Sequence, residues 1–343
     1  MPRIEELFET NTVLNYLRER QQPPMAGQEL FPERKIQGLS FEYLKGANNL
    51  PVVASVHAFD TETEIASREG IAKVSAEVAL IKRKIRMDER LIISLNKPRD
   101  NAEQRYAIEQ VFNDVDSMVM AVRARVEAMR MEVMSSGKLQ INENGVAVTI
   151  NYGVPNDHKE VLLDDALWTA STATPLDDLH DWVDKIVADT GVRPTRALTS
   201  RAVVNALLKH TTIRKAIYGV NSDRIPTRTE LNQLLSTHEL PVFATYDAMA
   251  RAQKADGTYG TFRYFPEDKV VLLPPGTLGD TIYGLTAEEI ELTNKPGVDI
   301  SKVGNIIAEI YKTNDPVARW TKAVATAIPS FPMADQVFIA KVK

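Results

Sequence analysis

The stretch "VFNDVDSMVMAVRARVEAMRMEVMSSGK" over residues 111–138 contains no proline, and its first glycine is Gly137. With the residues before it, this stretch predicts one unbroken helix over residues 101–136. Asp100 is a good N-cap, Glu103 stands where the acid of a capping box belongs, and Gly137 fits the C′ position. At 1.5 Å per residue the helix would be about 54 Å long. Enzyme domains rarely need such a helix, so we expect it to span something.

One side of this helix is apolar, because apolar residues recur in steps of three and four. The methionines among them indicate adaptable packing rather than a cofactor site. The residues predicted to pack the helix against the core are Val111, Phe112, Val115, Val119, Val122, Val126 and Met129. The charged residues placed on its remaining surface are Arg123, Arg125, Arg130, Asp114, Asp116 and Glu127.

The composition excludes several classes of protein. The chain has 343 residues, is 44% hydrophobic and contains no cysteine, which excludes disulfides, thiol nucleophiles and cysteine-based metal sites. A formal net charge of −5 gives no reason to expect tightly held nucleic acid. No apolar run reaches the roughly 18 residues of a membrane span, and the first 20 residues lack the apolar region of a signal peptide.

A search for catalytic and cofactor motifs returns nothing. The glycines form neither a dinucleotide fingerprint nor a P-loop, and H-E-x-x-H and G-x-S-x-G are absent. His180 and Asp184 stand four residues apart and could share a metal, but acids at a helix start are favoured by the macrodipole alone. We therefore predict no catalytic residue, no cofactor and no metal. The acids that we interpret as a helix start or a solvated surface are Asp177, Asp178, Asp181, Asp157, Asp164 and Asp165.

Turn signals divide the rest of the chain. Residues 4–20 predict a helix in an N-terminal arm, which Pro23 and Pro24 end. Asn144-Gly145 and Asp256-Gly257 each predict a hairpin between alternating apolar residues. A further helix is expected from Pro175 to Gly191.

The segment "SAEVALIKRKIRMDERLII" over residues 75–93 places charges among apolar residues without a clean period. It could not be buried inside its own subunit without unpaired charges, which are costly. We therefore expect this segment to be an extended excursion with solvated faces or a loop that packs on something outside the chain. The residues that would contact a neighbouring subunit are Lys82, Arg83, Lys84, Arg86, Asp88, Glu89 and Arg90.

The order of these parts resembles that of tailed-phage major capsid proteins, and is most similar to the phage lambda E-type family with the Hong-Kong-97 fold. The segments that carry the resemblance are "MRMEVMSSGKLQI", "KVVLLPPGTLGDTIYG" and "NDPVARWTKAVATAIPSFPMADQVFIAKV". Together they extend the likeness over nearly the whole chain. The resemblance implies an α+β fold with an N-terminal arm (1–34), an extended loop (35–95), a peripheral domain with the long spine helix and a hairpin (96–174), an axial domain (175–310) and C-terminal strands that return to the peripheral domain (311–343).

The resemblance also implies a structural role without catalysis. Pentamers and hexamers would form an icosahedral head shell around viral DNA, which is packaged without sequence-specific binding or a membrane. Scaffold and portal proteins are implied as partners, with room for a decoration protein. The protein would be made in the host cytoplasm and end in the virion.

Two alternatives stay open at this point. One is the shell protein of an encapsulin-like bacterial compartment, which has a similar fold. The other is a metal-dependent hydrolase that uses His180 and Asp184. Some proteins of the wider fold crosslink through lysine and asparagine. Lys73, Lys82 and Lys84 lie in the loop region, but nothing marks one of them as activated, so no crosslink is predicted.

Overall fold

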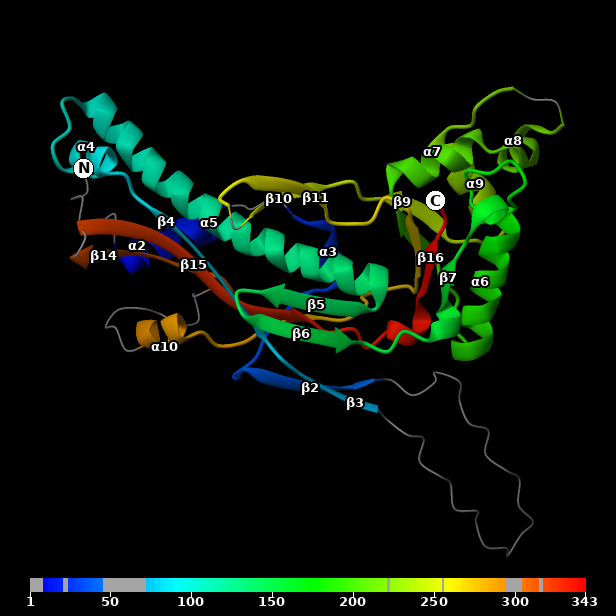
Figure 1. The fold of residues 1–343 in the computed structure, drawn as a ribbon, viewed down its shortest axis with the longest axis horizontal. Coiled ribbons are helices and arrows are strands. Elements are labelled where there is room, and N and C mark those ends of the chain that lie inside the picture. The colour runs from blue at the N-terminus through cyan, green and yellow to red at the C-terminus, as the bar shows by residue number, and fades with distance from the viewer. Residues whose placement is uncertain are drawn as a thin grey trace, which may run out of the picture.

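The long helix is the longest element of the fold and runs from one end of the molecule toward its middle (Figure 1). In the computed structural model it is α5, Asn101–Ser136, which confirms the predicted bounds. Asp100 Oδ1 accepts from the backbone N–H groups of Ala102 and Glu103, at 2.8 and 2.7 Å. Gly137 ends the helix with φ 70°. The structure describes residues 9–20, 24–45, 72–220, 223–254, 256–293, 304–314 and 317–343.

A five-stranded sheet packs against α5 and is called the β15 sheet after its central strand. β15 (Val317–Pro329) pairs antiparallel with β4 (Ala79–Arg86), β13 (Thr281–Tyr283) and β14 (Ile307–Asn314). β1 (Glu33–Lys35) adds parallel to β13.

Alanines on β15 form the surface on which α5 rests. Ala323, Ala325 and Ala327 alternate along the strand, are fully buried and share one core cluster with Val119 and Val122 of α5. Alternate residues of a strand point to the same face, and alanine is small, so the helix can approach the sheet closely.

A second five-stranded sheet, the β12 sheet, forms the other end of the molecule. β12 (Lys269–Leu273) pairs antiparallel with β8 (Arg196–Thr199) and β16 (Phe338–Lys341). β7 (Lys159–Val161) lies parallel to β16, and β9 (Val242–Thr245) lies parallel to β8. This sheet therefore combines segments that are far apart in the sequence.

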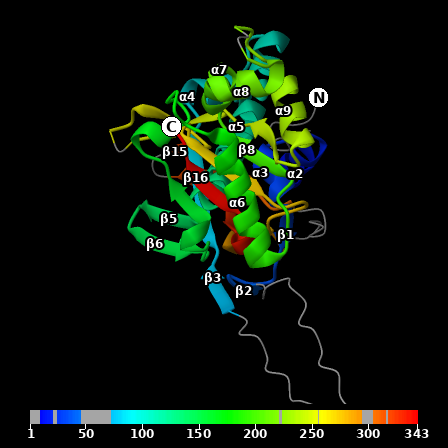
Figure 2. The same cartoon turned by 90° about the vertical axis from the view of Figure 1, so that its right-hand side faces the viewer.

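β12 separates two cores because its side chains alternate between them. Val270 and Leu272 pack in the core under the helices, whereas Val271 and Leu273 pack in the core that includes the end of α5. The helices stand in front of the sheet in Figure 2. They are α6 (Pro175–Thr190), α7 (Arg201–Lys209), α8 (Thr211–Tyr218) and α9 (Arg228–Thr237).

The outer edge of β9 is closed by a side chain. The backbone N–H of Phe243 donates to Asn232 Oδ1 at 3.0 Å, and Asn232 Nδ2 donates to the Phe243 carbonyl at 3.2 Å. The carboxamide of α9 thus occupies the position that the peptide group of another strand would take.

Among the described residues, three two-stranded ribbons stand apart from the sheets. Asn144 and Gly145 have φ angles of 50° and 82°, and Gly257 has φ 84°, so both predicted hairpins are confirmed. The ribbons are β2 (Ser40–Lys45) with β3 (Ala72–Glu77), β5 (Lys138–Glu143) with β6 (Val146–Asn151), and β10 (Met249–Gln253) with β11 (Tyr259–Arg263).

Shorter helices pack on these layers. α2 (Thr10–Glu19) docks on α5, with Val13 fully buried. Its Tyr16 hydroxyl donates to Asp116 Oδ2 at 2.8 Å. The other short helices are α3 (Ala26–Leu30), α4 (Glu89–Asn96) and α10 (Ala287–Thr293). No helix in the described part of the chain is both long and apolar enough to cross a membrane.

The strands do not follow the expected domain boundaries. β14 and β15 join the β15 sheet, but β16 lies inside the β12 sheet, and β7 pairs with it there. Phe338, Ile339 and Ala340 of β16 are all buried, as expected for a strand covered on both faces. β13, which was assigned to the axial range 175–310, instead pairs in the β15 sheet.

The expectation that residues 75–93 leave their own subunit also differs from the structure. β4 pairs with β15 of the same chain from Ala79 to Arg86. This is possible because β4 is a surface strand: its charged side chains point outward or meet acids, while its backbone pairs in the sheet. The central part of the predicted loop, residues 46–71, lies outside the described residues.

Candidate functional site

A buried polar junction lies where α5 meets three other parts of the chain. Glu127 of α5 is 0% exposed. Its Oε1 accepts from the backbone N–H of Gly27 in α3 and from the hydroxyl of Tyr246, which follows β9, both at 2.9 Å. A Cβ at Gly27 would stand 2.6 Å from Glu127 Oε2, so a larger residue here would require the Glu127 carboxylate to shift. Burial and the Glu127 carboxylate raise the pKa of Tyr246.

Arg130, one turn later on α5, completes this junction and is 3% exposed. Its Nε donates to Thr281 Oγ1 of β13 at 2.7 Å. Its guanidinium lies 3.5 Å from Glu127 and 3.6 Å from Glu33 of β1. A buried charge without such partners would cost several kcal/mol. The junction therefore fixes the arm, the helix and both sheets relative to one another.

Sequence reasoning placed Glu127 and Arg130 on the outer surface of the helix, and this was wrong. The period of the apolar stripe describes one face only, whereas this end of α5 is covered on several sides. The sequence did contain a signal for this junction. Glu127 and Arg130 have opposite charges, stand three residues apart and are surrounded by apolar residues from Val126 to Met131.

The end of α5 is also held by the β12 sheet. Lys269 Nζ of β12 donates to the Ser135 carbonyl at 2.8 Å, which satisfies one of the free carbonyls of the last turn. Burial lowers the pKa of Lys269.

The seven residues predicted to contact a neighbour lie on β4, on α4 and on the link between them. Lys82 Nζ is 3.1 Å from Glu288 Oε1 of the same chain, and Lys84 Nζ stands 4.5 Å from the centre of the Trp320 ring. Arg86 pairs loosely with Glu89. Asp88 Oδ1 caps α4 by accepting from the Arg90 N–H at 3.4 Å. Arg83 is half-buried, and the other six are exposed.

The seven residues predicted to pack α5 face inward. Phe112 is half-buried and packs against Tyr16 with the rings tilted by 39° and their centroids 4.4 Å apart. The other six are at most 5% exposed: Val111, Val115, Val119, Val122, Val126 and Met129.

One group in the described part of the chain has metal-like donor spacing, and it was not the pair that sequence reasoning considered. It consists of Asp157, His158 and Asp189. Lys185 Nζ lies between the two carboxylates, at 2.8 Å from Asp157 and 3.0 Å from Asp189. The lysine neutralises the acids and lowers the pKa of both carboxyl groups. The group is therefore satisfied as an ion-pair network that joins α6 to the turn just before β7. His180 instead stands edge-on to His238.

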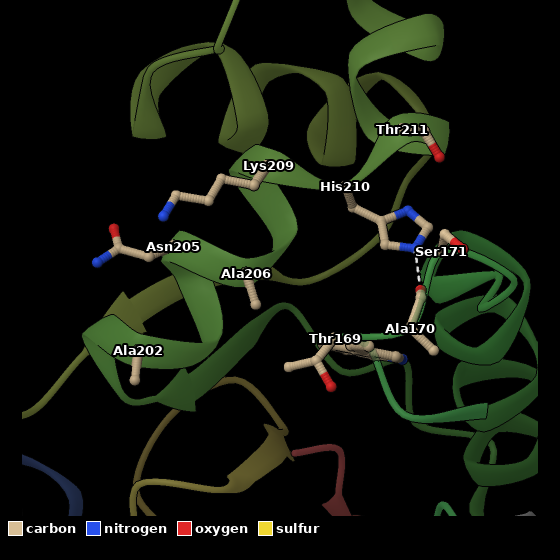
Figure 3. A pocket seen from close by; sticks show the side chains of 10 residues that line it. Thr169, Ala170, Ser171, Ala202, Asn205, Ala206, Lys209, His210 and Thr211 are labelled. Carbon is tan, nitrogen blue, oxygen red and sulfur yellow. Dashed lines mark hydrogen bonds between the residues drawn. The ribbon is translucent and has the colours of Figure 1, made fainter. Parts of the chain in front are cut away.

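A pocket of about 390 Å³ opens beside α7 (Figure 3). His210 in its wall is engaged on both sides, because Nε2 donates to the Ala170 carbonyl at 2.8 Å and Nδ1 accepts from the Thr212 N–H. Lys209 and Asn205 line the pocket, but none of its lining residues is a carboxylate.

Comparisons with known proteins place this geometry in context. Residues 9–342 match the family described as phage major capsid protein E. No curated protein sequence matches the chain. Among solved structures, the fold is similar to that of a candidate capsid protein of an Escherichia coli CFT073 prophage, with a TM-score of 0.61, 15% identity and coverage of 100% of this chain and 99% of the other.

Two further structures share the fold. A phage-related protein from Bordetella bronchiseptica RB50 has a TM-score of 0.52 and 14% identity, with 96% of each chain covered. The capsid of cyanophage A-1(L) has a TM-score of 0.50 and 10% identity, with 93% of this chain and 92% of the other covered. At these identities the likeness concerns the fold alone.

Proposed function

Because the chain belongs to the phage major capsid protein E family, we infer that copies of it assemble into the head shell of a virus. The protein is a structural shell component, and its place is the virion. The single observation that carries this function is the family match over residues 9–342. We assign it no catalytic role.

The finer arrangement is our proposal. Pentamers and hexamers close into an icosahedral shell around the DNA genome. Heterologous contacts, in which different surfaces of one chain meet, produce such rings. α5 braces the part of the subunit built on the β15 sheet, and the β12 sheet with its helices lies nearest the ring axis. The junction at Glu127 and Arg130 supports this arrangement, because its hydrogen bonds connect α5 to β13 of the β15 sheet and to Tyr246, which follows β9 of the β12 sheet.

Contacts from the charged segment to a neighbouring copy remain a prediction. Arg83 and Arg90 support it, because neither makes an ion pair with a described residue, unlike Lys82. Such exposed pairs are worth about 0.2–1 kcal/mol each, and a shell would repeat them in every subunit.

The proposed partners follow from the role of a shell. Scaffold and portal proteins assist assembly, and a decoration protein can bind the finished surface. The net charge of −5 is consistent with DNA that is enclosed without tight binding. Synthesis takes place in the host cytoplasm.

Electron microscopy tests the proposal directly. The purified chain, examined by size-exclusion chromatography and negative staining, is expected to form capsomers or closed particles of megadalton size. A preparation that contains only small oligomers under all assembly conditions would overturn it.

The metal-dependent hydrolase has a separate test. His180→Ala is expected to leave both assembly and the metal content unchanged. Stoichiometric zinc or manganese that is present in the wild type and lost in this variant would restore the hydrolase as a candidate. Family membership favours the viral shell over the encapsulin-like compartment.

A further inference from the structure

The β10–β11 ribbon exposes apolar side chains that its own subunit leaves uncovered. Met249 is 53% and Tyr259 is 56% exposed, and Phe262 is 38% exposed. Most residues of both strands are exposed on either face of the ribbon. A two-stranded ribbon is at best marginally stable alone in water, so this one would gain from a partner.

The same ribbon carries two cations near its free end. Arg251 and Lys254 make no ion pair with any residue that the structure describes; the Arg251 guanidinium only lies 5.8 Å from the centre of the Tyr259 ring. Arg263, at the base of the ribbon, is by contrast engaged by Asp247 and Glu267. The acid in the turn, Asp256, is occupied by Thr258.

α6 presents the opposite charge on its outer face. Asp177, Asp181 and Asp184 are exposed and follow one another at steps of four and three, so they share one side of the helix. None of them forms an ion pair with a described residue. Asp178 points inward instead and accepts from Trp168 Nε1 at 2.7 Å.

These two surfaces cannot meet within one subunit. In Figure 1 the ribbon lies beside α5 in the middle of the molecule, α6 lies at one end, and strands of the β12 sheet stand between them. In a ring built from heterologous contacts, one surface of each copy meets a different surface of the next. The two surfaces therefore have the placement that such a ring interface requires.

We propose that the β10–β11 ribbon of one copy docks on the acidic face of α6 in the adjacent copy of the same ring. This inference rests on the proposed shell function and identifies a surface that would build its rings. Arg251 and Lys254 meet the three aspartates, while Met249 and Tyr259 are covered at the same contact.

The dimensions of the two surfaces agree. Asp177 and Asp184 are seven residues apart on a helix, a distance of about 10 Å along the axis. Arg251 lies within β10 and Lys254 lies in the turn that follows the strand, so their Cα atoms are at most about 10 Å apart. Arginine and lysine side chains are long enough to adjust the remaining offset.

Charge reversal tests the pairing. The variant Asp177→Lys/Asp181→Lys/Asp184→Lys should lose closed particles at least tenfold by electron microscopy, and Arg251→Asp/Lys254→Asp should do the same. Combining all five substitutions in one chain restores opposite charges at every contact, and particles should recover to at least half the wild-type yield. A matched control adds Lys209→Asp/Lys215→Asp to the three aspartate substitutions, and it should not recover.

The results separate this inference from the shell function itself. Wild-type particles establish the shell. If each reversed surface alone still assembles normally, or if only the lysine control restores assembly, the ribbon–α6 contact is wrong although the shell function stands.

Crosslinking keeps the test independent of folding in the reversed variants. The chain has no cysteine, so Asp181→Cys/Arg251→Cys introduces one defined pair. Oxidised particles should then yield covalent ladders up to five or six chains on a denaturing gel, whereas Asp181→Cys/Lys209→Cys should yield monomers. A monomer band from the first pair in intact particles would refute the contact.

Discussion

The two ends of α5 are the same kind of helix in different surroundings. Its first turns, residues 101–106, are exposed or half-buried. Its last turns contain a run from Met129 to Ser135 in which only Glu132 is not buried. A helix that rests on one sheet can keep the remaining sides polar, whereas a helix that ends between two sheets and an arm must pair every charge it carries. α5 therefore has two structural roles: its first part supports the β15 sheet from one side, and its last turns are fixed between the two sheets and the N-terminal arm.

Breaking the helix between its two ends should have the largest effect. Val122 is fully buried, and proline there removes a backbone hydrogen bond and clashes with the preceding turn. We expect Val122→Pro to lower the free energy of unfolding by more than about 3 kcal/mol and to abolish particles. Urea unfolding and electron microscopy measure both. Asn101→Pro, at the first helical position where proline is tolerated, is the control; particles from Val122→Pro would show that α5 need not be continuous.

Removing a charge from the anchored end should be next in size. Arg130→Met leaves Glu127 buried with two neutral donors, and we expect a loss of about 3 kcal/mol. Arg125→Met removes a partly exposed pair with Glu143 and should cost at most about 1 kcal/mol. Urea midpoints of the unassembled variants measure the difference. Equal losses would mean that burial does not distinguish the two pairs.

Replacing Gly137, the glycine that ends α5, should lower the stability by a smaller amount. Gly137→Ala forces an L-residue into φ 70° and places its Cβ 2.6 Å from Val154 Cγ2. The backbone alone costs about 1–2 kcal/mol. Gly145→Ala has φ 82° with nothing within 4 Å, so it isolates the backbone cost. Thermal unfolding should rank Gly137→Ala as the more damaging change, and the reverse order would contradict close packing at this end.

The exposed start of α5 should give the smallest effect. Asp100→Ala removes two capping hydrogen bonds and is expected to cost about 1 kcal/mol. Asp88→Ala, which removes one long bond at α4, should cost less. A loss at Asp100 as large as that at Arg130 would erase the contrast between the two ends.

Local signals predicted much of this fold. Asp100, Gly137 and Asn144-Gly145 act through their own backbone, so their structural consequences could be identified without knowing the remainder of the chain. The valines of α5 were also predictable, because one buried face imposes a period. These features depend on residues at most a few positions apart.

Long-range pairing could not be predicted in the same way. β4 looked too charged for its own subunit, because the sequence does not reveal that β15 offers it a surface edge. β16 was expected to return to the peripheral domain, but it pairs with β12, which lies about 70 residues earlier in the chain. Glu127 and Arg130 were misplaced for the same reason: their partners Gly27, Tyr246 and Thr281 are distant in the chain.

The carboxamide of Asn232 at the edge of β9 has a consequence for error correction during shell growth. An open strand edge invites backbone pairing with any other open edge, and such contacts do not depend on side-chain identity. A protein that must add many copies to one particle needs contacts that release when misplaced. By saturating the backbone of Phe243, Asn232 leaves recognition at this edge to side chains, whose weak individual pairs can dissociate and form again until the geometry closes.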